Sequence, residues 1–360
     1  MKIVDGVLYD ARNEDLNKDG SFVFPNGVTG IGNNAFFYCP KLTSIIIPDS
    51  VTSIGRGAFS YCSNLTSVTI GNGVTSIEQH TFEGCPALTS ISIPNSVKSI
   101  GYCAFYNCTG LTSITIGNGV TSIEDLAFYG CSSLKSITIP DSVTKIGDWA
   151  FEGCSNLTSV ALGNGAKSIG SYVFEDCSSL KSIIVPESIT SIGIGAFSYC
   201  TSLKSITIPN SVTDIRTDEF YGCSGLTSIS IPESITRIEY DAFALTPRLK
   251  SKPNNYKAFS LTENGELKCR NKIYTVGKKS KVRGEIELCE RGIHYCTDLY
   301  DIFAYYYGEY GKDFVIGICE VSDENIGGGD DSKRCARWLK PTKILTKEEV
   351  IKILNGEYTE

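Results

Sequence analysis

Nine cysteines recur at a fixed spacing of 23 residues, which makes them the first candidates for chemistry in this chain. A thiol can ligate zinc, close a disulfide or act as a nucleophile. Zinc sites usually need Cys-x-x-Cys pairs or histidines, and the chain has no such pair and only two histidines. Disulfides between repeats are sterically allowed but unusual in a reducing cytosol. We therefore interpret the series as inert, buried thiols: Cys39, Cys62, Cys85, Cys108, Cys131, Cys154, Cys177, Cys200 and Cys223.

The remaining cysteines do not fit this series. Cys103 lies outside it, and we expect its side chain to be exposed. Five more follow in the C-terminal part, without the spacing of zinc ligands, and we expect free thiols there: Cys269, Cys289, Cys296, Cys319 and Cys335.

The same period runs through the apolar residues. Phe recurs ten times in one phase from Phe36 to Phe243, and Leu recurs from Leu42 to Leu249. Each unit contains Leu-x-x-Ile-x-Ile, the alternation of a short strand with one buried side. The segment Ala-Phe-x-x-Cys is too short for a stable helix and predicts a turn. A fixed period of this size predicts a solenoid, in which each repeat contacts only its neighbours.

These repeats resemble the BspA-type leucine-rich repeat over roughly residues 1–250. The resemblance implies a curved or nearly straight stack used for adhesion or recognition rather than catalysis. We expect residues 1–30 to form an N-terminal capping rung, because residues 7–9 and 21–25 mimic strands. The solenoid then covers residues 31–250, residues 251–255 form a linker, and residues 256–360 form a small α+β domain.

The composition excludes some classes of function. The formal net charge is −7, and neither part of the chain is basic, which argues against nucleic-acid binding. No apolar run is long enough to span a membrane, and the first residues lack the core of a signal peptide. We expect a soluble, cytoplasmic chain, although many relatives of this type are surface proteins, and export by another route stays open.

The binding surface is expected where residues vary inside the repeated frame. The outward strand positions are monotonous Ser and Thr, whereas the positions after the second Ile differ from rung to rung. Aromatic side chains beside carboxylates on a rigid scaffold are typical of interface anchors. Drift on an unselected surface is the alternative. Six residues on consecutive rungs are therefore predicted to bind a protein or glycan partner: Tyr102, Tyr106, Leu126, Tyr129, Trp149 and Tyr172.

Beyond residue 255 the period ends and the composition changes. Strands are predicted at residues 285–289, 314–321 and 334–340, and helices at residues 299–307 and 346–354. The motifs Lys268-Cys269-Arg270 and Glu290-x-Gly292-x-His294-x-Cys296 resemble small uncharacterised modules of phage and bacterial proteins. That resemblance brings no established activity.

A second resemblance suggests an enzyme. Arg291-Gly292-Ile293-His294-Tyr295-Cys296 followed by Ala304-Tyr305, and the segment 314–321, resemble poly-ADP-ribose polymerase-like transferases. The resemblance implies that Tyr305 stacks on the nicotinamide of NAD and that His294 takes the place of a family tyrosine. Asp331 falls nearest to the family's catalytic glutamate.

Two hypotheses follow. The first is a recognition protein that needs no cofactor. The alternative is a targeted effector whose C-terminal domain transfers ADP-ribose from NAD. The repeats favour the first.

Overall fold

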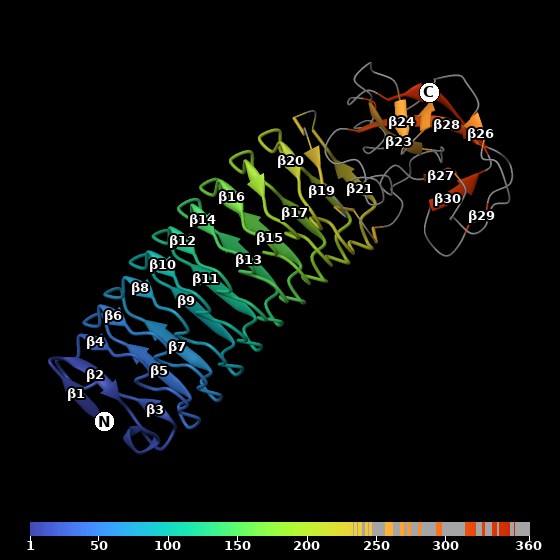
Figure 1. Cartoon of the computed structure of the whole chain (residues 1–360). Coiled ribbons are helices and arrows are strands. Elements are labelled where there is room, and N and C mark those ends of the chain that lie inside the picture. The colour runs from blue at the N-terminus through green and yellow to red at the C-terminus, as the bar shows by residue number, and fades with distance from the viewer. Residues whose placement is uncertain are drawn as a thin grey trace.

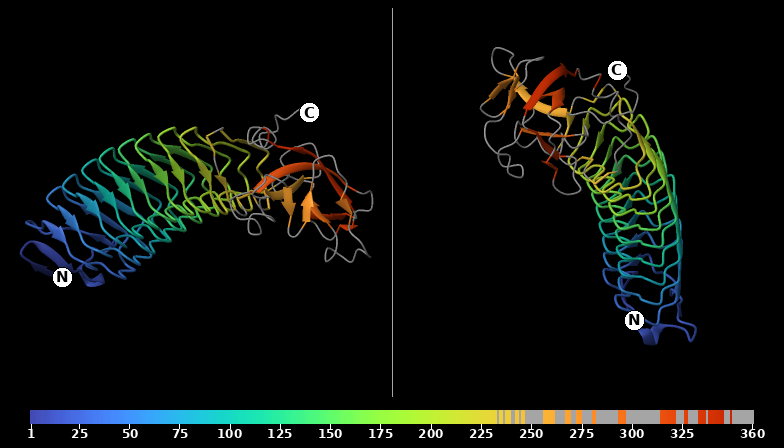
Figure 2. Two further views of the ribbon diagram at one scale, coloured as in Figure 1. Left: turned by 45° about the horizontal axis from the view of Figure 1, so that its top comes forward. Right: turned by 90° about the vertical axis from the view of Figure 1, so that its right-hand side faces the viewer.

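The computed structural model describes residues 1–232 without a gap, and then residues 234–235, 237–239, 242–243 and 245–246. In the C-terminal part it describes the backbone of nine strands between Tyr256 and Ile344, and residues 345 and 349. Figure 1 shows the repeats stacked in chain order. Figure 2 shows that they follow a curved axis.

Each rung of the solenoid contains a longer strand, a loop, a two-residue strand and a turn. The alternation of buried and exposed residues predicted for Leu-x-x-Ile-x-Ile is present, for example in Ser67–Ile70. The longer strands are β3 (Ser21–Phe22), β5 (Ser44–Ile47), β7 (Ser67–Ile70), β9 (Ser90–Ile93), β11 (Ser113–Ile116), β13 (Ser136–Ile139), β15 (Ser159–Leu162), β17 (Ser182–Ile184), β19 (Ser205–Thr207) and β21 (Ser228–Ser230).

The short strands form the second side of the stack. They are β4 (Gly30–Ile31), β6 (Ser53–Ile54), β8 (Ser76–Ile77), β10 (Ser99–Ile100), β12 (Ser122–Ile123), β14 (Lys145–Ile146), β16 (Ser168–Ile169), β18 (Ser191–Ile192), β20 (Asp214–Ile215) and β22 (Arg237–Ile238). Pairing on both sides is parallel and joins residues 23 positions apart, such as Ser44 with Ser67. The longer strands form two five-stranded sheets, β3 to β11 and β13 to β21.

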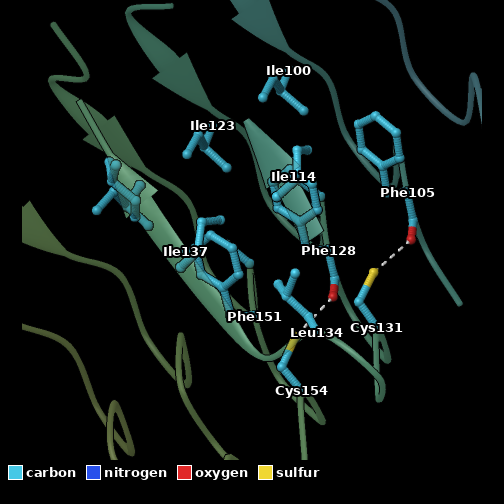
Figure 3. Close-up of a cluster of buried hydrophobic side chains, with 14 of the residues drawn as sticks. Ile100, Phe105, Ile114, Ile123, Phe128, Cys131, Leu134, Ile137, Phe151 and Cys154 are labelled. Atoms are coloured by element: carbon cyan, nitrogen blue, oxygen red, sulfur yellow. Dashed lines mark hydrogen bonds between the residues drawn. The ribbon is translucent and has the colours of Figure 1, made fainter. Parts of the chain in front are cut away.

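The core is a ladder of identical side chains (Figure 3). From Phe36 to Phe243 the phenylalanine rings form a stack of nearly parallel rings, with neighbouring centroids 5.1–5.7 Å apart. Full burial of one such ring contributes about 2 kcal/mol. Leu and Ile rows fill the space between the rings and the strands. Each repeat of 23 residues therefore adds the same set of side chains to one continuous core.

The cysteine series lies inside this core. All its members are buried and free, and burial raises the pKa of thiols such as Cys62. From Cys62 onward, each thiol donates a hydrogen bond to the carbonyl oxygen of the Phe 26 residues earlier, with Sγ–O distances of 3.0–3.3 Å. The burial predicted for the series is confirmed.

Threonines connect the rungs at the surface. The hydroxyl groups of Thr66 and Thr121 donate to the carbonyl oxygens of Thr43 and Lys98 in the preceding rungs, at 2.9 and 3.0 Å. The same bond recurs in other rungs. These threonines precede the strands, and they are distinct from the outward-facing Ser and Thr of the longer strands. They connect each rung to the preceding one.

The N-terminal end is closed by a hairpin. Strand β1 (Lys2–Val4) pairs antiparallel with β2 (Val7–Asp10), and β2 continues the parallel order into β4. A 3-10 turn, η1 (Asn13–Asp15), follows, and the terminal amine lies 2.8 Å from a carboxylate oxygen of Asp15. The predicted strands at residues 7–9 and 21–25 correspond to β2 and to the shorter β3.

The described strands of the C-terminal part form one antiparallel sheet. They are β23 (Tyr256–Leu261), β24 (Leu267–Cys269), β25 (Lys272–Tyr274), β26 (Ser280–Lys281), β27 (Ile293–Cys296), β28 (Phe314–Val321), β29 (Ile326–Gly327), β30 (Lys333–Ala336) and β31 (Trp338–Ile344). The strand predicted at residues 314–321 is β28. The one predicted at 334–340 is divided between β30 and β31. The strand predicted at 285–289 and the helix at 299–307 lie outside the described residues, as does the helix at 346–354 except Glu349, which is helical.

Candidate functional site: the turn groove

The turns have a backbone geometry that the sequence pattern did not reveal. Two residues of each turn have a positive φ, in the left-handed region that favours Gly, Asn and Asp. The second lies four residues after the first, in a row that includes Tyr38, Tyr61 and Tyr199. The first forms the row that runs from Asn34 to Asp218. The ends of this row follow that preference, with Asn34 and Gly57 near the N-terminus and Gly195 and Asp218 near the C-terminus. Five consecutive central rungs instead carry larger side chains: His80, Cys103, Leu126, Trp149 and Tyr172, with φ between 52° and 59°.

These central side chains surround a groove on the turn face, which we call the turn groove. Its volume is about 580 Å³, and it opens to solvent. It is lined by His80, Glu83, Tyr102, Cys103, Tyr106, Leu126, Tyr129, Trp149 and Glu152. Five of the six predicted partner-binding residues line it, and the sixth, Tyr172, stacks on Trp149 next to it. The 23-residue period thus brings the six together.

Stacking between rungs fixes the aromatic rings. Tyr106 and Tyr129 are parallel, with centroids 4.7 Å apart, and Trp149 and Tyr172 are parallel at 5.7 Å. Tyr172 also covers Gly195, where an added Cβ would lie 2.3 Å from the Tyr172 ring. One face of each of these rings is therefore covered by a neighbouring rung.

Glu83 marks the N-terminal end of the groove. Its carboxylate accepts a hydrogen bond from the Tyr61 hydroxyl at 2.7 Å and lies 2.7 Å from Nδ1 of His80. The His80 ring in turn meets Tyr102 edge to face at 5.3 Å. This end of the groove is a rigid polar network.

Glu152 marks the other end. Partial burial, together with repulsion from Glu175 and Asp176, raises the pKa of Glu152 to about 7, although a hydrogen bond with Tyr129 favours its charged form. Burial and the charge of Asp176 likewise raise the pKa of Glu175. None of the ion pairs in the described part of the chain includes these three carboxylates.

Other acidic residues of the turns have a structural role. Asp125 accepts the backbone N–H of Asp148 at 3.0 Å, and Asp148 accepts that of Ser171 at 2.7 Å. These carboxylates connect successive rungs. They are therefore separate from the groove carboxylates, although the sequence alone does not distinguish the two kinds.

Four residues of the groove are not among the six predicted binding residues: His80, Glu83, Cys103 and Glu152. Cys103 was expected to be exposed, which is wrong: its side chain is 5% exposed, and burial raises its pKa. Its turn position places it between His80 and Leu126 on the adjacent rungs, and Tyr102 contacts the thiol. His80 was not singled out, although the repeat period places it one rung before Cys103.

Of the three residues of the transferase hypothesis, the structure describes only His294. His294 lies in β27 and pairs with Cys335 of β30, whereas Tyr305 and Asp331 lie outside the described residues. Over the described ranges, no group of His, Cys, Asp and Glu residues could hold a metal ion. Within the same ranges no helix has the length and apolarity needed to cross a membrane.

The stacked 23-residue rungs define a leucine-rich-repeat solenoid, and comparison with known families makes this more specific. Residues 18–135 and 121–250 match the family model described as BspA type leucine rich repeat region, in 6 copies. The chain therefore belongs to the BspA-type leucine-rich repeat family. Residues 255–353 match a family described only as a domain of unknown function, so the transferase resemblance is not supported.

One solved structure agrees with this assignment, and a second is similar in sequence. A leucine-rich repeat protein from Eubacterium ventriosum is 30% identical, with a TM-score of 0.51, over 68% of this chain and 68% of that one. A leucine rich cell surface protein from Faecalibacterium prausnitzii is 29% identical over 64% of this chain and 83% of its own, with a TM-score of 0.39. A search of curated proteins gives no match.

Proposed function

We propose that this protein is a recognition protein whose solenoid binds a protein or glycan partner through the turn groove. The observation that carries the proposal is the row of large side chains at left-handed turn positions. Such a conformation costs a side chain about 1 kcal/mol relative to Gly. Drift would let Gly, Asn and Asp accumulate there, as they do at the ends of the row. Retention of larger residues on five adjacent rungs favours selection for a surface.

The chemistry of the groove supports the same role. Tyr and Trp side chains are enriched at the centres of interfaces, because each supplies a large contact area at low conformational cost. The scaffold is rigid, so little entropy is lost when a partner binds. Binding of this kind needs no cofactor, and we propose none. NAD belongs only to the transferase alternative, which no specific observation favours.

A binding comparison between two double variants tests the proposal. The full chain is labelled and applied to a peptide library and a glycan array. We expect a ligand that binds the native chain to bind at least about tenfold more weakly to the variant Trp149→Ala/Tyr172→Ala, because the stacked pair is lost.

The matched control changes large side chains on the opposite, strand side. Ile46 of β5 and Ile184 of β17 are 69% and 83% exposed. The variant Ile46→Ala/Ile184→Ala should keep full affinity, and all variants should keep the circular dichroism of the native chain. Equal affinity of both double variants would contradict the proposal.

A further inference from the structure

Negative charge is concentrated in the turns. The nine six-residue turn segments from residue 33 to residue 222 contain eight acidic residues and one basic residue, Arg56. The formal net charge of these segments together equals that of the whole chain, −7. Because Asp125 and Asp148 bind backbone N–H groups and Glu219 is buried, the remaining carboxylates form the charge that a partner meets.

The groove has an apolar middle and an acidic residue at each end. Leu126 and the edges of the tyrosine rings line the space between Glu83 and Glu152. The two glutamates occupy equivalent turn positions three rungs apart, which corresponds to about 15 Å along the stack. An extended peptide spans that distance in about four to five residues.

The carboxylates at the Glu152 end favour a cation as the ligand, because none of them belongs to an ion pair in the described part of the chain. Glu83, at the other end, already contacts Tyr61 and His80 and offers a cation only its remaining lone pairs. Glu152, Glu175 and Asp176 repel one another, and a bound cation would relieve that repulsion. A sugar stacks on a ring face, and one face each of Tyr106, Tyr129 and Trp149 is already covered by a stacked neighbouring ring, which leaves less area for such a ligand. The ring edges and carboxylates that remain suit an aliphatic stem that ends in a positive charge.

We propose that the turn groove binds an extended basic protein segment, in which two Lys or Arg side chains four residues apart reach Glu83 and Glu152. An apolar side chain between them packs on Leu126. This inference rests on the proposed function and specifies its ligand. Charge-assisted hydrogen bonds from guanidinium groups to the two carboxylates set the spacing of the two cationic side chains.

A designed peptide tests this assignment on the intact chain. The probe is a labelled Gly-Arg-Gly-Leu-Gly-Arg-Gly peptide, whose binding is followed by fluorescence anisotropy. We expect Glu152→Gln to weaken binding at least about fivefold, which corresponds to roughly 1 kcal/mol. Raising the salt concentration from about 50 mM to about 300 mM should also weaken binding, because the interacting charges are partly exposed.

Two controls separate charge at the site from charge in general. Glu187 is exposed in the loop after β17, outside the groove, so Glu187→Gln should change the affinity by less than about twofold. A peptide with Glu in place of both Arg residues should not bind. The inference is overturned if that peptide binds equally well, or if Glu152→Gln binds the basic peptide like the native chain.

The outcomes also distinguish this inference from the proposed function. One outcome is that no basic peptide binds, while a neutral glycan binds the native chain and not the variant Trp149→Ala/Tyr172→Ala. The groove would then be a binding site, but the ligand assigned to it would be wrong. Self-association by light scattering that disappears in the same variant would place a second copy in the groove, and would also overturn the inference. Absence of any groove-dependent ligand would refute both.

Discussion

Glu219 occupies a turn position that holds alanine in seven of the nine equivalent rungs. Its side chain is fully buried, with one carboxylate oxygen accepting the backbone N–H of Arg216 at 2.9 Å. The other oxygen has no hydrogen-bond partner. Burial raises the pKa of Glu219 well above its usual value. At this residue the repeat tolerates a group that opposes folding when charged.

The first stability prediction concerns this carboxyl group. Its folded-state pKa is raised, so between the unfolded and folded values the native state binds more protons, and stability falls as pH rises. We expect Glu219→Ala to increase the free energy of unfolding by about 1–3 kcal/mol at pH 8, and by less near pH 5. Chemical denaturation at both pH values measures the difference.

The matched control is an exposed glutamate. Glu187→Ala should change the free energy of unfolding by less than about 0.5 kcal/mol at either pH. Glu152, whose pKa of about 7 is raised mainly by burial, should leave part of the pH dependence in place in the Glu219 variant. A loss of stability in Glu219→Ala at pH 8 would show that the carboxylate has a partner in solution.

At the scale of elements, the left-handed conformation of the turn position predicts an unusual order of stability for Gly and Ala variants. At Leu126 we expect the Gly variant to be more stable than the Ala variant by about 1 kcal/mol, because Gly adopts positive φ without a steric penalty. Thr115, exposed in β11, should show the opposite order. Thermal denaturation of the four variants gives both comparisons. A more stable Ala variant at position 126 would contradict the left-handed geometry.

Sequence pattern predicted some elements and not others, for physical reasons. The longer strands were predictable because alternation over Leu-x-x-Ile-x-Ile reports one buried side. A two-residue strand such as β6 carries no alternation, and its pairing depends on the neighbouring rung. The positive φ of His80 and Trp149 was not predictable, because residue types other than Gly and Asn rarely indicate that conformation. The antiparallel pairing of β28 with β23 and β31 depends on tertiary contacts that no local pattern encodes.

The candidate site was partly predictable for the same reason. In a solenoid, positions 23 residues apart are neighbours, so the period alone placed the predicted aromatic residues on adjacent rungs. The period does not tell which carboxylates bind backbone groups, as Asp148 does, and which face the groove, as Glu152 does. That distinction depends on side-chain direction within the turn.

At the scale of the whole molecule, the stack is a one-dimensional system. Phe128 lies between Phe105 and Phe151, at centroid distances of 5.1 and 5.2 Å, so it contributes to two rung interfaces in the middle of the ladder. Phe36 lies near the end of the ladder, against Phe22 and Phe59. In such a stack, the free energy of unfolding is close to a sum of contributions from the rungs and from the interfaces between them. The position of a defect along the axis therefore determines how many rungs it destabilises.

We therefore expect two similar cavities to have different consequences. Phe128→Ala should lower the free energy of unfolding by about 3–5 kcal/mol and raise hydrogen exchange in the rungs on both sides, because the stack is divided there. Phe36→Ala should raise exchange only in the first rungs and leave those beyond β8 protected, because fraying is confined to one end. Phe37→Ala, at a side chain that is 51% exposed, serves as the control and should change neither. Hydrogen-exchange mass spectrometry resolves these patterns. Uniform loss of protection along the whole stack in Phe36→Ala would mean that the rungs unfold as a single cooperative unit rather than as a chain of neighbours.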